Sequence, residues 1–330
     1  MSDYTLFVLA GLAVVGAGTV LASAADAVAE LTGLGRLWVG AILLAAATSL
    51  PELLTGVAAI RIGAPDLAVG DLFGSSMANM LILALLDLVW ARRKLLRSVA
   101  FEHSLAACLA ITTNALAAAF VLAAPATLIL GVSPGSLLIV AIYLSGTRAI
   151  QRSTAPPPPA AGPPRAAVPV GRLVGPFSAF AIAAAVIAIA APAFARAAEA
   201  IAIDSGLGAT FVGTLLLGFA TSLPELVACL AAMRIGALDL AVGNLFGSNA
   251  FNMATLLAFD LVSPGASIFT MLSPLHALSG LFAVALMALG LAAIVYRAER
   301  RFRMIEPDSL AMVMLYAVGV AMLYAAAVPR

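Results

Sequence analysis

The chain has 330 residues, of which 63% are hydrophobic and only 10% are charged, whereas a soluble domain carries about 25% charged residues. This composition excludes an ordinary water-soluble protein and predicts that most of the chain lies in lipid. The net charge of +1 argues against a nucleic-acid partner, which would need a strongly basic face.

Ten stretches of the chain are apolar and long enough to cross a bilayer as helices, which takes about 20 residues each. The first lacks the basic flank and the cleavage site of a signal peptide, so we expect it to be a retained span. The fold class is therefore an all-α integral membrane protein. The ten predicted spans are 5–24, 37–62, 66–90, 101–123, 126–147, 173–200, 209–233, 238–262, 273–296 and 309–328.

Between the fifth and sixth spans lies the one clear linker, which contains Ala155–Pro159 and a second proline pair at Pro163 and Pro164. Prolines in such runs cannot continue a helix. We therefore divide the chain into a first five-helix repeat, a proline-rich cytoplasmic linker and a second five-helix inverted repeat. Their bounds are 1–150, 151–172 and 173–330.

Positive charges gather in the loops after spans 3, 5 and 9, which all lie on one side of the membrane. The positive-inside rule places that side in the cytoplasm and both termini outside. The alanine-rich, arginine-biased composition favours a prokaryotic source and hence the cytoplasmic membrane. The charges are Arg92, Arg93, Lys94 and Arg97, then Arg148, Arg152, Arg165 and Arg172, then Arg297, Arg300, Arg301 and Arg303.

An internal repeat is the strongest signal in the sequence. More than half of the positions from Gly33 to Asn79 are identical, without a gap, to those from Gly206 to Asn252, far above chance even for apolar sequence. Five spans separate each residue from its copy, and because five is odd the copies face opposite ways across the bilayer. Inverted repeats of this kind place a binding site near the midplane and expose it alternately to the two sides.

Each copy of the repeat contains one glutamate in the middle of a span, Glu52 and Glu225. An ionised carboxylate at that depth costs about 2.5–3.5 kcal/mol or more, so it needs a partner of opposite charge. No lysine or arginine lies near either glutamate within the spans. A cation from solution is therefore the natural partner.

The residues around each glutamate supply further oxygens. Thr48 shares a helix face with Glu52, four residues on, and Ser49 lies beside it. Pro51 lacks an amide hydrogen and disfavours helical geometry before it, so helices 2 and 7 are predicted to be broken at a midplane ion site. Irregular backbone is tolerated there only where it lines a cavity or is buried in protein. The copies in the second repeat are Thr221, Ser222 and Pro224.

The next span of each repeat adds a serine and an asparagine four residues apart, Ser75 with Asn79 and Ser248 with Asn252. The complete set offers carboxylate, hydroxyl, amide and carbonyl oxygens. Ca²⁺ takes six to eight such ligands in loose geometry. Because no histidine or cysteine lies beside these positions, softer metals such as Zn²⁺ and Cu⁺ are poor candidates.

At these residues the sequence resembles the sodium/calcium exchanger family of the calcium:cation antiporter superfamily, prokaryotic type, over about 33–90 and 206–262. The resemblance implies a secondary transporter rather than an enzyme, with no cofactor and with Ca²⁺ and Na⁺ bound as substrates. It also implies that spans 1 and 6 slide over the core. The implied metal-site residues are Glu52, Glu225, Thr48, Thr221, Ser49, Ser222, Ser75, Ser248, Asn79 and Asn252. Many prokaryotic members carry aspartate where this chain has Asn252, so we expect two carboxylates at the centre rather than three.

Three alternatives stay open from the sequence. Two are transporters, an H⁺/Ca²⁺ exchanger and a Na⁺-coupled transporter of another divalent cation. The third is a membrane lipid pyrophosphate phosphatase, which would need basic groups to hold phosphate, and none flank the two glutamates. Stoichiometry, coupling to H⁺ or K⁺, regulation by the linker and the oligomeric state are also left open.

The other polar residues have simpler interpretations. The mirrored aspartates are expected at span ends near the interface, and Glu102, His103 and His276 at solvated helix starts. The mirrored aspartates are Asp66 with Asp239 and Asp87 with Asp260. Cys108 and Cys229 lie in apolar stretches far apart, so we expect two buried thiols without a disulfide.

Overall fold

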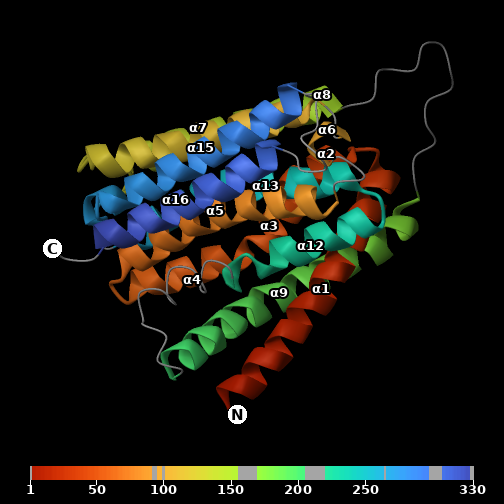
Figure 1. The fold of residues 1–330 in the computed structure, drawn as a ribbon, viewed down its shortest axis with the longest axis horizontal. Helices are drawn as coiled ribbons and strands as arrows, with labels where there is room; N and C mark the ends of the chain where they lie inside the picture. Colours follow the sequence, from red (N-terminus) through yellow and green to blue (C-terminus); the bar gives the residue numbers. More distant parts are fainter. Residues whose placement is uncertain are drawn as a thin grey trace.

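The computed structural model describes residues 2–90, 95–98, 101–154, 169–204, 220–263, 265–296 and 307–327. These residues form helices, apart from connecting turns and one isolated bridge between Ile129 and Val132. The long helices lie side by side as a bundle (Figure 1). This architecture confirms the predicted all-α class for the described part of the chain.

The helices of the first half are α1 (Asp3–Thr32), α2 (Arg36–Trp38), the π-helix η1 (Val39–Leu44), α3 (Ala45–Thr48), α4 (Leu50–Arg61), α5 (Pro65–Val89), α6 (Leu95–Ser98), α7 (His103–Ala123) and α8 (Pro134–Thr154). Those of the second half are α9 (Val170–Asp204), α12 (Leu223–Arg234), α13 (Leu238–Ala254), α14 (Leu256–Val262), the 3₁₀-helix η3 (Ile268–Met271), α15 (Leu275–Tyr296) and α16 (Pro307–Ala327).

Among the described residues, eight helical segments are long and apolar enough to cross a membrane. They correspond to the predicted spans 1 to 4, 6 and 8 to 10, so the chain is a multi-pass membrane protein. The predicted span 209–233 begins outside the described residues, and only its second part is seen, as α12. The linker segment 155–168 and the copied residues Gly206–Gly208 also lie outside them, as do the clustered charges of 91–94 and 297–306.

The fifth predicted span, 126–147, is misplaced. The helix there is α8, which begins at Pro134 and continues to Thr154. Helix α7 ends at Ala123 and is followed by Ala124 in a left-handed conformation (φ 41°), and a turn around Gly131 (φ 85°) precedes α8. A proline at the first position of a helix is favourable because its missing amide hydrogen has no partner there. Hydropathy alone could not place this boundary, because the turn residues are themselves apolar.

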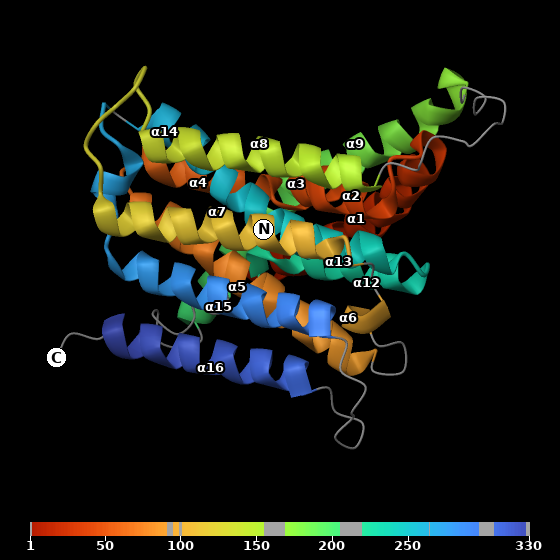
Figure 2. The ribbon, with the colours of Figure 1, turned by 90° about the horizontal axis from the view of Figure 1, so that it is seen from above.

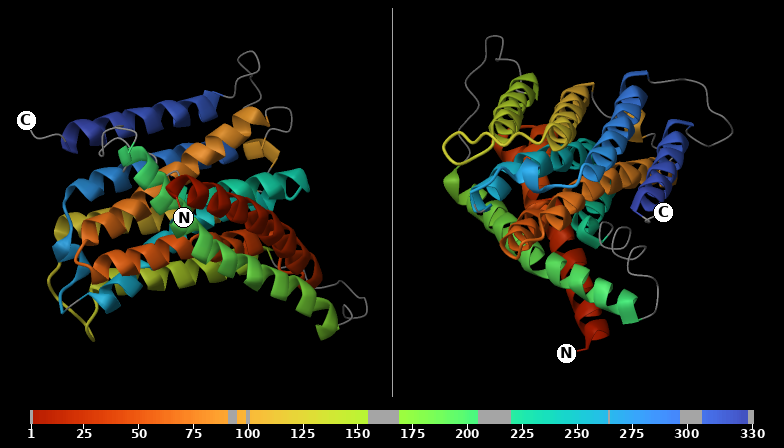
Figure 3. Two further views of the ribbon diagram at one scale, coloured as in Figure 1. Left: turned by 90° about the horizontal axis from the view of Figure 1, so that it is seen from below. Right: turned by 90° about the vertical axis from the view of Figure 1, so that its left-hand side faces the viewer.

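Helices α1 and α9 pack along each other and run obliquely to the remaining bundle (Figures 1 and 3). Their contact surfaces are rich in small residues, which let helix backbones approach closely. Gly11 of α1 is one of them, because a Cβ there would lie 3.1 Å from the ring of Phe194 on α9. At the outer end, Phe7 stacks on Phe194 with ring centroids 4.5 Å apart. Together, helices α1 and α9 touch both glutamate-bearing helices, because α1 contacts α12 and α9 contacts α4.

The rest of the bundle covers the opposite side of the glutamate-bearing helices. Helices α5 and α13 lie in the centre and contact each other. Helix α5 also contacts α4 and α12, and α13 contacts α12. Helices α7 and α15 pack outside them, and α16 lies at the edge against α15 and α5 (Figure 2). The two copies of the signature motif therefore meet between the α1–α9 pair and this larger layer.

Two histidine–aspartate pairs join the predicted repeats to each other. His103 Nε2 lies 2.9 Å from Asp239 Oδ1, and His276 Nε2 lies 2.9 Å from Asp66 Oδ1. The spacing between the histidines, and between the aspartates, equals the spacing between Glu52 and Glu225. The expectation of a solvated helix start is wrong for His103, which is fully buried, because α13 covers it. Glu102 is exposed, as expected.

A second mirrored set involves buried aspartates. Asp87 accepts hydrogen bonds from the Leu96 amide and from Ser309 Oγ. Asp260 accepts hydrogen bonds from the Ser133 amide and from Ser136 Oγ, at the start of α8. Both aspartates are almost fully buried, at 3% and 1% exposure. Both lie near the ends of their spans, as expected, at α5 (Pro65–Val89) and α14 (Leu256–Val262). They face protein rather than solvent there, and they hold the beginnings of neighbouring helices.

Asp260→Ala should strongly destabilise the fold. Asp260 accepts from the amides of Ser133 (2.9 Å) and Ile268 (2.7 Å) and from Ser136 Oγ (2.6 Å). Each buried group left unpaired costs about 1–3 kcal/mol, so we expect a loss of about 3 kcal/mol or more. Thermal unfolding in detergent measures it. Ser136→Ala, which keeps both amide bonds, should cost only about 1 kcal/mol, and equal losses in the two variants would contradict this role.

One of the two thiols differs from the expectation. Cys229 is buried, but Cys108 is exposed on α7, and neither forms a disulfide. An apolar stretch in a membrane protein faces either protein or lipid, so its composition did not distinguish the two environments.

Candidate cation-binding site

The first copy of the motif lies on a helix whose regular form changes twice. A π-helical segment, η1, leads into α3. The helix is then interrupted at Ser49 (φ −91°, ψ 8°), and α4 begins at Leu50. Pro51 has no amide hydrogen to donate to the carbonyl of Ala47. Ser222 has nearly the same conformation (φ −82°, ψ 6°) before α12. The backbone thus departs from the helix at the same position in both copies, and π-helical segments are frequent at functional sites.

Glycines bring α13 unusually close to η1. A Cβ on Gly247 would lie 2.2 Å from the carbonyl oxygen of Ala41, and one on Gly40 would lie 2.5 Å from the carbonyl oxygen of Leu240. Both contacts are with backbone, which a side chain could not displace. The crossing therefore requires glycine and brings the polar face of α13 against the end of α3.

Each threonine of the motif contacts the other repeat. Thr48 Oγ1 lies 3.3 Å from Ser248 Oγ and donates to Asn244 Oδ1 at 3.3 Å. Thr221 Oγ1 lies 3.3 Å from Ser75 Oγ and donates to Asp71 Oδ1 at 3.1 Å. The two sets of contacts mirror each other, so the halves of the predicted site interleave.

The two glutamates are buried between these contacts, Glu52 at 1% and Glu225 at 0% exposure. Glu225 Oε1 accepts from Ser49 Oγ at 3.3 Å and from Ser248 Oγ at 3.5 Å. Its second oxygen, and both oxygens of Glu52, have no hydrogen-bond partner among the described residues. Every arginine whose side chain the structure describes is exposed, so none of them neutralises these carboxylates.

The asparagines at the centre are only partly paired. Asn79 Nδ2 donates to Asn249 Oδ1 at 2.9 Å, and Asn249 Nδ2 donates to the carbonyl of Ser76 at 3.2 Å. Asn79 Oδ1 has no hydrogen-bond partner among the described residues. The same is true of Ser222 Oγ and of both side-chain polar atoms of Asn252. The structure therefore buries all ten predicted site residues.

Buried polar atoms without partners are concentrated at this site. The described residues contain ten such side-chain atoms, and seven belong to Glu52, Glu225, Asn79, Asn252 and Ser222. Leaving them unpaired is costly, whereas a hard cation would pair the six oxygens among them. No three histidine, cysteine or acidic side chains in the described residues converge as a metal cluster. A cation bound here would take hydroxyl, amide or backbone oxygens in addition to the carboxylates.

Sequence reasoning missed three residues of this site, Asp71, Asn244 and Asn249. Asp71 is partly exposed and hydrogen-bonded to Thr221, so a third carboxylate lies at the margin of the expected pair. The signal was the four-residue spacing of Asp71, Ser75 and Asn79, which shares one helix face. All three missed residues differ between the copies, and a comparison restricted to identical pairs overlooks them.

Comparisons with known proteins find sodium/calcium exchangers and a putative antiporter among the proteins similar to this chain. The family model described as sodium/calcium exchanger protein matches residues 2–147 and 176–325. The inner membrane protein YrbG of Escherichia coli is 27% identical over 289 residues, which cover 79% of this chain and 80% of YrbG. The putative antiporter CaxA of Alkalimonas amylolytica is 39% identical over 69 residues, only 21% of this chain and 22% of CaxA.

Solved structures of the sodium-calcium exchanger NCX_Mj have the same fold. The structure soaked with 100 mM Na⁺ and 10 mM Sr²⁺ matches with a TM-score of 0.72 at 19% identity, covering 99% of both chains. The structure soaked with zero Na⁺ and Ca²⁺ matches with a TM-score of 0.71 at 20% identity, covering 97% of this chain and 98% of that one.

Proposed function

The chain belongs to the sodium/calcium exchanger protein family, and from this premise we propose that it exchanges Na⁺ for Ca²⁺ through a site built on Glu52 and Glu225. Family membership makes it a secondary transporter rather than an enzyme, which leaves the phosphatase alternative without support. Ca²⁺ and Na⁺ bind in this proposal as transported substrates, not as resident cofactors.

The observation that carries the proposal is the pair of buried glutamates with unpartnered oxygens. Three of their four carboxylate oxygens have no hydrogen bond from the described residues, and every arginine whose side chain the structure describes is exposed. One Ca²⁺ cancels two negative charges, and so do two Na⁺, so either ion can make the buried site neutral. Competition for the same charge is the physical basis of exchange, because occupancy by one ion displaces the other.

The packing supports alternating access by movement of α1 and α9. Helix α1 contacts α12 and α9 contacts α4, and most of the buried residues of α1 and α9 are alanine or glycine. Packed helices can slide past one another by small shear movements. The predicted inversion of the repeats supports two equivalent arrangements, one open to each side. We propose that the α1–α9 pair moves across the glutamate-bearing helices, exposing the ions first to one face and then to the other.

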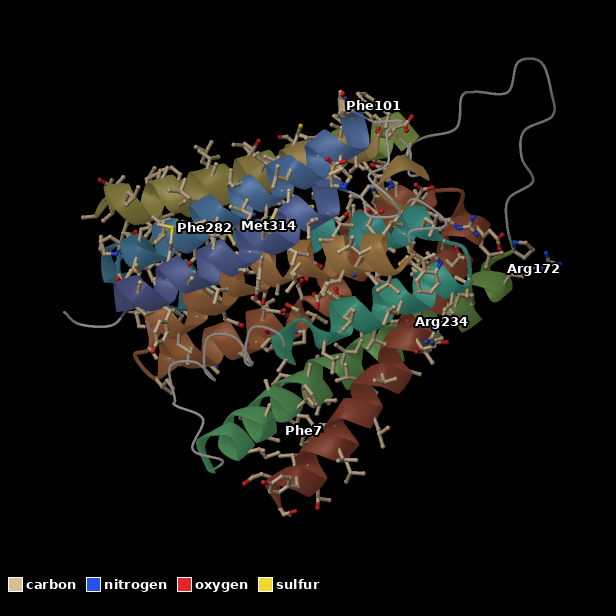
Figure 4. The ribbon with its side chains drawn as sticks, in the orientation of Figure 1. Phe7, Phe101, Arg172, Arg234, Phe282 and Met314 are labelled. Carbon is tan, nitrogen blue, oxygen red and sulfur yellow. The ribbon has the colours of Figure 1, made fainter. Side chains whose placement is uncertain are left out.

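The location proposed is the cytoplasmic membrane, with both termini on the outer side. Arg172, at the start of α9, and Arg234, at the end of α12, lie at the same end of the bundle, which Figure 4 shows on the right. Arginine concentrates on the cytoplasmic side of membrane proteins, which supports assigning this end to the cytoplasm.

Flux measurements in proteoliposomes test the function. We expect ⁴⁵Ca²⁺ to accumulate in vesicles loaded with Na⁺ and diluted into Na⁺-free medium, and no accumulation when K⁺ replaces Na⁺ inside. A pH gradient of equal size is the second arm, and Mn²⁺ and Mg²⁺ replace Ca²⁺ in the third. Uptake driven by the pH gradient alone would instead support the H⁺/Ca²⁺ exchanger, and Na⁺-driven uptake of another divalent ion alone would support the remaining alternative.

A further inference from the structure

The two halves of the site differ by one negative charge. Asp71 occupies in the first repeat the position that Asn244 occupies in the second. Each accepts a hydrogen bond through Oδ1 from the threonine of the opposite repeat, Asp71 from Thr221 at 3.1 Å and Asn244 from Thr48 at 3.3 Å. The geometry is therefore mirrored while the charge is not.

These positions lie on opposite sides of the glutamate pair. Helix α5 begins at Pro65 at one end of the bundle, and α13 begins at Leu238 at the other end (Figure 1). Each residue is six positions into its helix, about 9 Å from the helix start at 1.5 Å per residue. Asp71 thus lies between the glutamates and the face where α5 begins, and Asn244 lies between them and the opposite face.

Asp71 is also partly exposed and joined to the site through Thr221. Asn244, by contrast, is fully buried. Thr221 Oγ1 lies 3.1 Å from Asp71 Oδ1 and 3.3 Å from Ser75 Oγ, so Asp71 contacts the same threonine as a predicted site serine. No arginine whose side chain the structure describes is buried among these residues. A cation arriving from the face where α5 begins therefore meets an additional carboxylate before it reaches Glu52.

We propose that Asp71 is a specificity-determining residue that strengthens cation binding from one face only, the face where α5 begins, and favours Ca²⁺ over Na⁺ there. The inference rests on the proposed exchange function. Coulomb attraction to a fixed carboxylate is twice as large for a divalent as for a monovalent ion at the same distance. Under the proposed orientation this face is extracytoplasmic, so the transporter binds external Ca²⁺ more tightly than internal Ca²⁺.

Right-side-out and inside-out membrane vesicles expose the two faces separately and test the asymmetry. Asp71→Asn makes the two halves alike, and we expect it to weaken the apparent affinity for Ca²⁺ about tenfold at the face where α5 begins. The affinity at the other face should change by less than about threefold. Apparent Na⁺ affinity should change less than that of Ca²⁺ at the affected face.

Asn244→Asp is the matched variant, because it adds the same charge at the mirrored position. We expect it to strengthen Ca²⁺ binding at the opposite face, a gain that misfolding cannot produce. Combining both substitutions should reverse the asymmetry, and Asp71→Glu should largely retain it. Unchanged affinities, or equal changes at both faces, would overturn the inference. If the unsubstituted protein shows no Na⁺-driven Ca²⁺ flux in either vesicle type, the proposed function itself has failed.

Discussion

Glu52→Gln and Glu225→Gln should each abolish Na⁺-driven Ca²⁺ uptake, with an expected loss of more than about a hundredfold. Each substitution removes one of the two charges that neutralise a buried Ca²⁺, and each tenfold loss of affinity corresponds to about 1.4 kcal/mol. The measurement is ⁴⁵Ca²⁺ uptake in proteoliposomes with equal amounts of protein. Glu102→Gln is the control, because Glu102 is exposed at the start of α7 and its substitution should leave uptake unchanged.

The same two variants should be at least as stable as the unsubstituted protein when no Ca²⁺ is present. Glu52 has no hydrogen-bond partner among the described residues, and a charged carboxylate at membrane depth costs about 2.5–3.5 kcal/mol or more. A neutral amide of the same shape removes that cost. Thermal unfolding in Ca²⁺-free, Na⁺-free detergent solution checks it. Full transport, or a loss of transport that merely follows unfolding, would be incompatible with a cation-binding role.

Gly247→Ala should disable transport through the backbone rather than through charge. The added Cβ would lie 2.2 Å from the carbonyl oxygen of Ala41 and 2.5 Å from its Cα, so α13 and η1 must separate. Separation would pull Ser248 and Asn244 away from Thr48. We expect a loss of stability of about 1–3 kcal/mol and a loss of Ca²⁺ affinity of at least about tenfold.

Gly16→Ala provides the comparison for this prediction. Gly16 lies exposed on α1, with nothing within 4 Å of an added Cβ. Alanine there should keep transport and should add about 0.5–1 kcal/mol of helix stability. Thermal unfolding and equilibrium ⁴⁵Ca²⁺ binding distinguish the two glycines. If Gly247→Ala bound Ca²⁺ normally, the close helix crossing would not be what holds the site together.

Much of this site could be predicted from the sequence because its motif occurs in both repeats. The repeated motif identified Glu52 and Glu225 by the cost of burying charge, and the four-residue spacing placed Thr48 and Ser75 on their helix faces. The crossed contacts between Thr48 and Ser248 required the structure, since nothing in one repeat specifies which residue of the other lies beside it. That both glutamates bind a cation stays a prediction.

The errors have a common physical origin. The lipid-facing and protein-facing surfaces of a spanning helix are both apolar, so sequence did not separate exposed Cys108 from buried Cys229. Nor did it anticipate that α13 covers His103. Asp71 escaped notice because its partner in the repeat is Asn244, and the identity of the copies was the signal being followed. The difference between the copies carries the more specific information about this chain.

Anomalous diffraction from crystals grown with Ca²⁺, and with Sr²⁺ in its place, tests most directly whether the opposed acids hold the transported ion. We expect one peak between the carboxylates of Glu52 and Glu225, with Ca²⁺–oxygen distances of about 2.3–2.6 Å, and loss of that peak when Na⁺ is added in excess. A Ca²⁺-loaded crystal with no peak between these carboxylates, or with its peak elsewhere in the protein, would contradict the account.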